Sequence, residues 1–222
     1  NLYNKKYNEL KEAKNFPLLN RAISYQSHNP PGSVFKVPIA LFALQSRVIN
    51  RYTRYRCRGY MFNPKHFKCS HKTGCGNINV VDAIEGSCNV FFYHVGQKIA
   101  KDLSPEALER CLKIFGFGIK SGLGFIKEAA GYIPTPDKKK KRGGAWVPGD
   151  RRKIGIGQRF DATPIQVARC MAMVALGGVM PKLKIFKEAP SQIDHIESSD
   201  NYKTLVSGST NKIRKKAEVL WQ

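Results

Sequence analysis

Long hydrophobic runs are missing from this chain of 222 residues. The two longest, Val37–Leu44 and Cys170–Val179, fall well short of the roughly 18 apolar residues that span a bilayer. We therefore expect no transmembrane segment. The chain starts at Asn1 and no basic and apolar leader follows, so we expect it to begin downstream of any targeting signal.

Acidic residues are also few. Asp and Glu number 16 against 38 Lys and Arg, which gives a formal net charge of +22. Such a surplus favours polyanionic surroundings, namely nucleic acid, anionic lipid or an acidic wall polymer, although a solvated basic surface explains it without a partner. Because no zinc-finger, RNA-binding or basic-zipper signature accompanies the charge, nucleic-acid binding is not expected. The densest cationic run, Lys138–Arg142, is interpreted as a flexible loop.

Cysteine pairs at the C-x-x-C spacing of zinc ribbons and thioredoxins are absent from the sequence. Cys57, Cys69 and Cys75 nevertheless crowd into one short stretch, together with His66 and His71. Their spacing is compatible with a disulfide or with a structural zinc, and the sequence leaves both open.

The remaining composition is that of a globular domain. Hydrophobic residues make up 42% of the chain and charged residues 24%, which excludes a disordered tail. Residues 33–49 are apolar nearly all round, as in a buried helix. Thr163, Pro164 and Gln166 have the pattern of a capping box and predict a helix that runs to about residue 176. Further helices are expected over residues 7–14, 80–85, 90–100 and 104–115.

Two long stretches separate these helices. Residues 50–79 are basic, rich in turns and bear cysteines, and we interpret them as an insertion or flap within the domain. Residues 116–162 are rich in glycine and predict a loop, and a strand is expected near Leu183–Phe186. Cys111 and Cys170 stand among apolar neighbours and are expected in the core.

Ser33 and Lys36 form an S-x-x-K pattern at the start of the apolar helix. On a helix, positions i and i+3 share a face, so the hydroxyl and the amine can meet. A serine hydroxyl is a poor nucleophile unless a base stands beside it. An amine buried among apolar residues has a lowered pKa and can accept the proton of that hydroxyl. The pattern alone is common, so it becomes informative only with other motifs.

Two further motifs lie downstream. Ser87 and Asn89 supply a second hydroxyl and an amide at a break between helices, where they can relay a proton and hold a substrate amide, although Ser and Asn also serve simply as helix caps. Lys72-Thr73-Gly74 spells the Lys-Thr-Gly element that accompanies such motifs in serine acyl-enzymes. It lies between the other two motifs in a polar stretch without a strand pattern, so we expect it to be a coincidence.

Taken together, these stretches resemble the penicillin-binding protein transpeptidases, most of all class B enzymes of the elongation (penicillin-binding protein 2) type. The resemblance rests on four stretches in the family's order. They are Asn20-Arg21-Ala22 with PPGSVFKVPIALFAL, then EGSCNVFFYHVG, then FGFGIKSGLGFIKEAAGYIPTP, and finally GDRRKIGIGQRFDATPIQVARCMAMVALGGVMPK.

The resemblance implies an α/β (α+β) fold of the penicilloyl-serine transferase type, with a helical region and a partial antiparallel sheet. It implies a peptidoglycan D,D-transpeptidase in which Ser33 attacks the penultimate D-Ala carbonyl of a stem peptide and Lys36 acts as the base. Ser87 would pass a proton to the leaving amine, and Asn89 would hold the substrate backbone. β-Lactams would acylate Ser33. The implied setting is the extracytoplasmic, periplasmic face of the inner membrane, with the cell-wall elongation machinery as partner.

Two departures from the family pattern stand out. No Lys-Ser/Thr-Gly triad follows the GIGQ stretch within the chain, so we expect a transpeptidase domain, residues 1–222, that is incomplete at both ends. Some relatives of the elongation type bind a structural zinc near residues 74–76 through His, Asp and Cys. By that resemblance, Cys57, Cys69 and Cys75, with His71 or Asp82, would provide a softer ligand set. No other cofactor is implied.

Two alternatives remain open at this point. A class D-like serine β-lactamase shares the S-x-F-K stretch but does not account for residues 20–22 or for the helix after Thr163. A non-catalytic or truncated β-lactam-binding module would account for the missing third motif. Turnover of a β-lactam, as opposed to a lasting adduct, separates the β-lactamase from the transpeptidase, whereas a Lys-Thr-Gly motif on a strand farther along the coding sequence would argue against the non-catalytic module.

Overall fold

The computed structural model describes residues 2–24, 29–104, 106–124 and 128–184. The elements in chain order are α1 (Leu2–Glu12), the short 3-10 helix η1 (Gly32–Phe35), α2 (Lys36–Gln45), β1 (Tyr55–Cys57), β2 (Gly76–Ile78), α3 (Val80–Glu85), α4 (Asn89–Asp102), α5 (Ala107–Ile114), α6 (Pro136–Lys141), α7 (Pro148–Ile154) and α8 (Pro164–Ala175).

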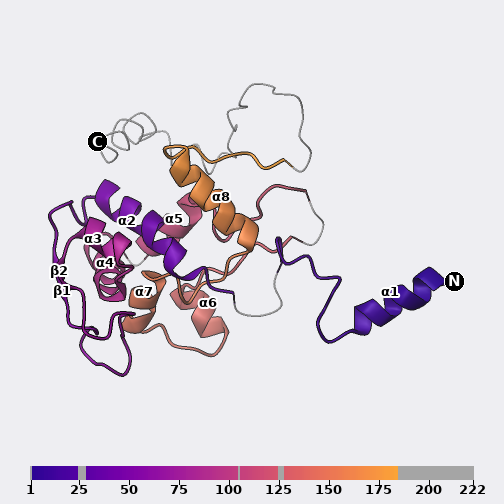
Figure 1. The fold of residues 1–222 in the computed structure, drawn as a ribbon, viewed down its shortest axis with the longest axis horizontal. Coiled ribbons are helices and arrows are strands. Elements are labelled where there is room, and N and C mark those ends of the chain that lie inside the picture. The colour runs from indigo at the N-terminus through magenta and orange to yellow at the C-terminus, as the bar shows by residue number, and fades with distance from the viewer. Residues whose placement is uncertain (1, 25–28, 105, 125–127, 185–222) are drawn as a thin grey trace.

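Helix α4 is the centre of the described domain. It contacts α2, α3, α5, α7 and β1, which surround it (Figure 1). Most of its residues are buried, among them Phe91, Phe92 and Ile99, as expected for a helix that is covered on nearly every side. By contrast, α1 has no buried residue and lies away from this body in Figure 1. The core is therefore a cluster of helices around α4.

Helices α4 and α7 pack closely because glycines stand at the contact, Gly96 within α4 and Gly155 directly after α7. A methyl group on Gly96 of α4 would overlap the carbonyl oxygen of Arg151, and one on Gly155 would overlap that of Phe92. The close approach fixes where the loop after α7 begins. That loop carries the GIGQ stretch of residues 155–158.

Strands β1 and β2 form a two-stranded antiparallel sheet within the stretch interpreted as an insertion. Tyr55 pairs with Ile78 and Cys57 with Gly76. The segment between the strands folds back onto α4, where the rings of Phe67 and Tyr93 meet edge to face at 5.3 Å. The whole stretch therefore lies against the central helix.

Several sequence predictions are confirmed. The helix expected over residues 80–85 is α3, which Asn79 caps by accepting from the backbone N–H groups of Val81 and Asp82. Thr163 and Gln166 form the predicted capping box of α8. The buried Gln166 side chain also donates to the carbonyls of Ile119 and Ala130, which ties α8 to the glycine-rich stretch. Cys111 and Cys170 are buried in the core, as expected.

Other predictions are wrong or fall outside the description. Residues 116–162 are not one continuous loop, because α6 and α7 lie within them, and Lys138–Lys141 belong to α6. The helix predicted over residues 33–49 ends at Gln45. The helix expected over residues 7–14 lies at Leu2–Glu12. Residues 183 and 184 are not in a strand, and residues 185–186 lie outside the described residues.

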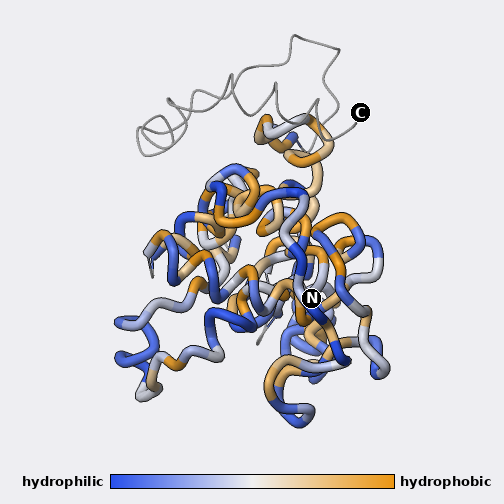
Figure 2. The backbone as a smooth tube through the Cα atoms, turned by 90° about the vertical axis from the view of Figure 1, so that its left-hand side faces the viewer, coloured by the Kyte–Doolittle hydropathy of each residue, from blue (hydrophilic) through white to orange (hydrophobic). Residues whose placement is uncertain are grey.

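No helix among the described residues is long and apolar enough to cross a membrane. Figure 2 shows the hydropathy of the described residues along the backbone: hydrophobic and hydrophilic segments alternate, and no long coloured stretch is uniformly hydrophobic.

Candidate active site

Ser33 lies in a tight turn at the start of the α2 region. Gly32 has φ +66°, a left-handed conformation that glycine adopts without strain. Its N–H donates to the carbonyl of Gly157 at 2.9 Å, so the loop after α7 supports the turn. A methyl group on Gly157 would overlap the Gly32 carbonyl, which explains why a glycine is needed there too. The resulting Ser33 side chain is exposed.

Lys36 stands three residues farther on and is buried, with 2% of its surface exposed. In a 3-10 turn, positions i and i+3 eclipse each other, so Ser33 and Lys36 lie on the same side. The Lys36 Nζ donates to the Ser87 carbonyl at 2.6 Å, to Ser87 Oγ at 2.9 Å and to Asn89 Oδ1 at 2.7 Å. These three contacts bring the two predicted motifs together.

The surroundings of Lys36 favour its neutral form. Burial lowers the pKa of the Lys36 amine, and the nearby thiols of Cys69, Cys88 and Cys75 oppose this shift only in part. The ring of Phe92 lies 5.8 Å from Nζ and forms one of the apolar neighbours. A lysine with a lowered pKa at this position can serve as a general base.

Ser87 and Asn89 are held at the junction between α3 and α4. Ser87 has φ +48°, a conformation that costs a non-glycine residue about 1–3 kcal/mol and is typical of functional turns. Asn89 is the first residue of α4, and its Nδ2 donates to the carbonyl of Lys68 at 3.1 Å. The Tyr93 hydroxyl donates to the same carbonyl at 3.3 Å. The cysteine-bearing stretch thus positions the amide of Asn89.

Lys72-Thr73-Gly74 lies in a turn and not on a strand. The Gly74 N–H donates to the His71 carbonyl at 3.0 Å, and Gly74 has φ +90°. This placement agrees with the prediction that the sequence match is a coincidence.

Four thiols gather directly behind the Ser87–Asn89 junction. The Sγ atoms of Cys57, Cys69, Cys75 and Cys88 all lie within 4.8 Å of one another. The Cys69 Sγ is 3.8 Å from the sulfur of Cys75 and 3.8 Å from that of Cys88. Four sulfurs at 2.3 Å from a tetrahedral zinc would be separated by about 3.8 Å, so this donor set fits a structural zinc.

The thiols of the cluster differ in their pKa values. Burial acts to raise the pKa of Cys69, but hydrogen bonds from the backbone N–H groups of His71 and Asn89 and from the Cys75 thiol outweigh it and bring the pKa to about 6. Burial raises the pKa of Cys75 to about 11 and that of Cys88 further. One thiolate thus forms readily, and a bound cation would be needed to ionise the rest.

The predicted fourth ligand is wrong. His71 Nε2 lies 2.8 Å from the carbonyl of Gly86, and the carboxylate of Asp82 accepts the N–H of Asn79 as part of the α3 cap. Neither residue belongs to the thiol cluster. The fourth member of the cluster is Cys88, which follows the left-handed turn at Ser87.

Comparison with known proteins decides the family. The family model described as "Penicillin binding protein transpeptidase domain" matches residues 2–216. The chain belongs to the penicillin-binding protein transpeptidase family.

Individual members of the family are similar to the chain in sequence and in structure. The peptidoglycan D,D-transpeptidase MrdA of Escherichia coli is 34% identical over 181 residues, which cover 79% of this chain and 28% of that protein. PBP2 of Pseudomonas aeruginosa superimposes with a TM-score of 0.68 at 33% identity, over 78% of this chain and 38% of that one. PBP2 of Helicobacter pylori, solved in complex with MreC, gives 0.67 at 35% identity, over 78% and 32%. The chain thus spans less than a third of the length of the MrdA relative from Escherichia coli.

Two features of the site were missed in the sequence. The membership of Cys88 in the thiol cluster was not predicted, because Cys88 lies between two candidate catalytic residues and was considered only as part of that motif. The support of Gly32 by Gly157 was also missed, because the two residues are distant in the chain. The IGIGQ stretch of residues 154–158 was noticed only as part of the resemblance.

Proposed function

We propose that this chain carries the acyl-transfer site of a peptidoglycan D,D-transpeptidase. The Ser33 hydroxyl attacks the carbonyl of the penultimate D-Ala of a stem peptide and forms an acyl-serine ester, with release of the terminal D-Ala. A stem-peptide amine then takes the acyl group and forms the crosslink. The observation that carries the proposal is the three-way contact of Lys36 with Ser87 and Asn89, one turn from Ser33.

The proton follows this contact network. Neutral Lys36 accepts the proton of the Ser33 hydroxyl as the ester bond forms, and burial supports the neutral amine. Ser87 Oγ, 2.9 Å from Nζ, passes a proton to the leaving amine of D-Ala. Asn89 has two amide N–H donors, of which one is used by Lys68, so the second is available for the substrate backbone.

β-Lactams acylate the same serine, because their ring amide presents a comparable carbonyl to the Ser33 hydroxyl. The ester persists since nothing in the described network holds a second base against a hydrolytic water. A class D-like β-lactamase would instead turn the compound over, and the family match to residues 2–216 favours the transpeptidase.

The cellular setting follows from the relatives. PBP2 of Helicobacter pylori was solved with MreC, so we propose an MreC-like protein of the elongation machinery as a partner. Stem peptides lie outside the cytoplasm, and we place the domain on the extracytoplasmic, periplasmic side of the inner membrane. The anionic surface of the membrane or wall would attract the net charge of +22.

The thiol cluster is proposed to hold a structural zinc. Cys57, Cys69, Cys75 and Cys88 would supply four thiolates, and a bound zinc would hold the insertion against the start of α4. Three of the four come from residues 50–79 and the fourth from the catalytic motif. The metal would therefore fix the position of Asn89 and take no part in the acyl transfer.

Release of D-alanine from a stem-pentapeptide analogue tests the proposed function. We expect release by the native protein, loss of it in Ser33→Ala, and retention in Ser46→Ala, a matched change at the other end of α2. β-Lactam turnover faster than adduct accumulation would support the β-lactamase alternative. Release that persists in folded Ser33→Ala would refute the assignment of the nucleophile.

A further inference from the structure

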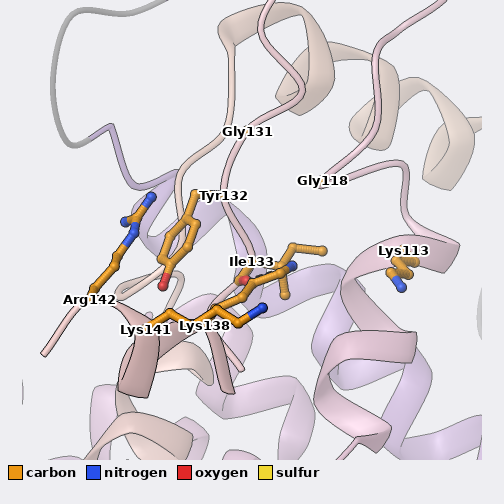
Figure 3. A pocket seen from close by; sticks show the side chains of 8 residues that line it. All are labelled: Lys113, Gly118, Gly131, Tyr132, Ile133, Lys138, Lys141 and Arg142. Atoms are coloured by element: carbon orange, nitrogen blue, oxygen red, sulfur yellow. Dashed lines mark hydrogen bonds between the residues drawn. The ribbon is translucent and has the colours of Figure 1, made fainter. Parts of the chain in front are cut away.

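A cationic hollow lies between the end of α5 and α6, away from the Lys36 network in the chain. It has a volume of about 400 Å³. The side chains of Lys113, Lys138, Lys141 and Arg142 surround it, and Tyr132 and Ile133 complete the wall (Figure 3). Backbone of Gly118 and Gly131 also lines it. None of its eight lining residues is acidic.

Helix α6 presents its cations to the hollow because its other side is anchored. The Lys139 Nζ donates to the buried carboxylate of Asp150 at 2.7 Å. Lys138, Lys141 and Arg142 follow the spacing i, i+3 and i+4, which places them on a common helix face. Of the five cations at 138–142, Lys139 thus anchors the helix, three line the hollow and Lys140 does neither.

Two of these cations are held in place before any ligand arrives. The Lys138 Nζ donates to the carbonyl of Ile133 at 3.2 Å, which fixes the ammonium at the wall. The Arg142 guanidinium stacks on the ring of Tyr132 with its central carbon 3.8 Å from the ring centroid. Figure 3 shows Arg142 and Lys113 on opposite sides of the hollow. Ordered cations lose less freedom on binding an anion than mobile ones.

The nearby acids balance only part of this charge. Glu109 lies 3.0 Å from the Lys113 Nζ, so Lys113 is paired within α5. Asp137 stands in the first turn of α6, beside the three cations. Like charges at i, i+3 and i+4 repel one another and weaken a helix. A bound anion of more than one charge would relieve that repulsion.

We propose that this hollow is a binding site for a phosphate-bearing anion, with the diphosphate group as the best match. A guanidinium offers a planar fork to phosphate oxygens, and two lysines add point charges beside it. Three cations exceed what a single carboxylate neutralises, whereas a diphosphate carries enough charge for all of them. The site is independent of acyl transfer, and no residue of the Lys36 network belongs to it.

Inorganic pyrophosphate is the probe, and its binding to the native protein is measured by calorimetry with acetate as the comparison anion. The test variant combines Lys138→Gln, Lys141→Gln and Arg142→Gln. The matched control combines Lys5→Gln, Lys6→Gln and Lys11→Gln on α1, which removes the same charge. We expect at least a tenfold loss of pyrophosphate affinity in the test variant and less than a twofold loss in the control, with both variants folded by circular dichroism.

Vesicles separate the two sources of phosphate. The ligand is a lipid headgroup if three results hold together: the protein binds phosphatidylglycerol vesicles, pyrophosphate displaces it from them, and only the test variant fails to bind them. If vesicle binding is the same in both variants while pyrophosphate affinity falls only in the test variant, the ligand is a soluble phosphate. Equal losses of pyrophosphate affinity in both variants, or acetate binding as tight as pyrophosphate binding, would overturn the site.

Discussion

The Lys36 Nζ lies 2.7 Å from the Asn89 Oδ1, and this contact joins segments that are 53 residues apart in the chain. The contact links the start of α2 to the start of α4, the central helix. Because Asn89 also donates to Lys68, the amine, the amide and the cysteine-bearing stretch form one connected unit. The chemistry at Ser33 therefore depends on residues from three regions of the sequence.

Replacement of Lys36 by methionine should slow acylation while leaving the fold intact. A general base contributes about 10²–10⁴-fold, so we expect the rate of β-lactam acylation to fall by that factor in Lys36→Met. Methionine has a similar volume but leaves the Ser87 carbonyl and Asn89 Oδ1 without this donor, at a cost of about 1–3 kcal/mol for each buried acceptor, so circular dichroism must show that the variant is folded. Lys98→Met, on the outer side of α4, is the control and should keep the native rate. An unchanged rate in Lys36→Met would exclude the lysine as base.

Acylation should depend on pH through the same amine. Burial lowers the pKa of Lys36 from 10.5, and only its neutral form accepts a proton. The rate therefore rises with pH and levels off once pH exceeds this lowered pKa, so the midpoint falls below 10.5. Rates measured against pH in the native protein and in Lys36→Met check this. A midpoint at or above 10.5, or the same rise in the variant, would contradict the prediction.

Gly157→Ala should displace the turn that carries Ser33, although residue 157 is distant from Ser33 in the chain. Gly157 has φ +74° and its added methyl would overlap the Gly32 carbonyl, whereas Gly143 has φ +75° and open space around it. Both variants should lose about 1–2 kcal/mol of stability from the left-handed backbone. Only Gly157→Ala should lose about a further 1–3 kcal/mol from the overlap. Thermal unfolding and acylation rates of the two variants measure the difference, and equal behaviour would refute the contact.

The thiol cluster should bind zinc, and replacement of one of its cysteines should abolish that binding. We expect about one zinc per chain in the purified protein. Cys88→Ala should lose it and unfold at a lower temperature, because the fourth ligand is gone and the insertion is no longer fixed. Cys111→Ala, which removes a buried thiol outside the cluster, should keep the metal. Metal analysis that finds no zinc in the native protein would contradict the cluster assignment.

Local features such as helix caps could be predicted from the sequence better than contacts between residues that are distant in the chain. Asn79 and Thr163 carry their own capping partners within three residues, so α3 and α8 could be placed from short-range patterns. Thr135-Pro136 has the same start signal as Thr163-Pro164, yet the glycines around it suggested a loop and α6 was missed. A short polar helix has no apolar face that would reveal it in a pattern.

The candidate active site could likewise be predicted only where short motifs mark its residues. Ser33, Lys36, Ser87 and Asn89 were proposed from motifs, and the structure brings Lys36, Ser87 and Asn89 into direct contact. Cys88 could not be assigned as a ligand, because its place in the cluster depends on the left-handed turn at Ser87 and on the fold of residues 50–79. The family resemblance suggested His71 or Asp82 instead, and the His71 ring lies against a backbone carbonyl.

Intact mass after incubation with a penicillin tests the central claim most directly. The account predicts a stable adduct of one penicillin on the native protein and none on Ser33→Ala, with both proteins folded by circular dichroism. An adduct that persists in Ser33→Ala, or a folded native protein that forms no adduct, would contradict the assignment of Ser33 as the acylated nucleophile.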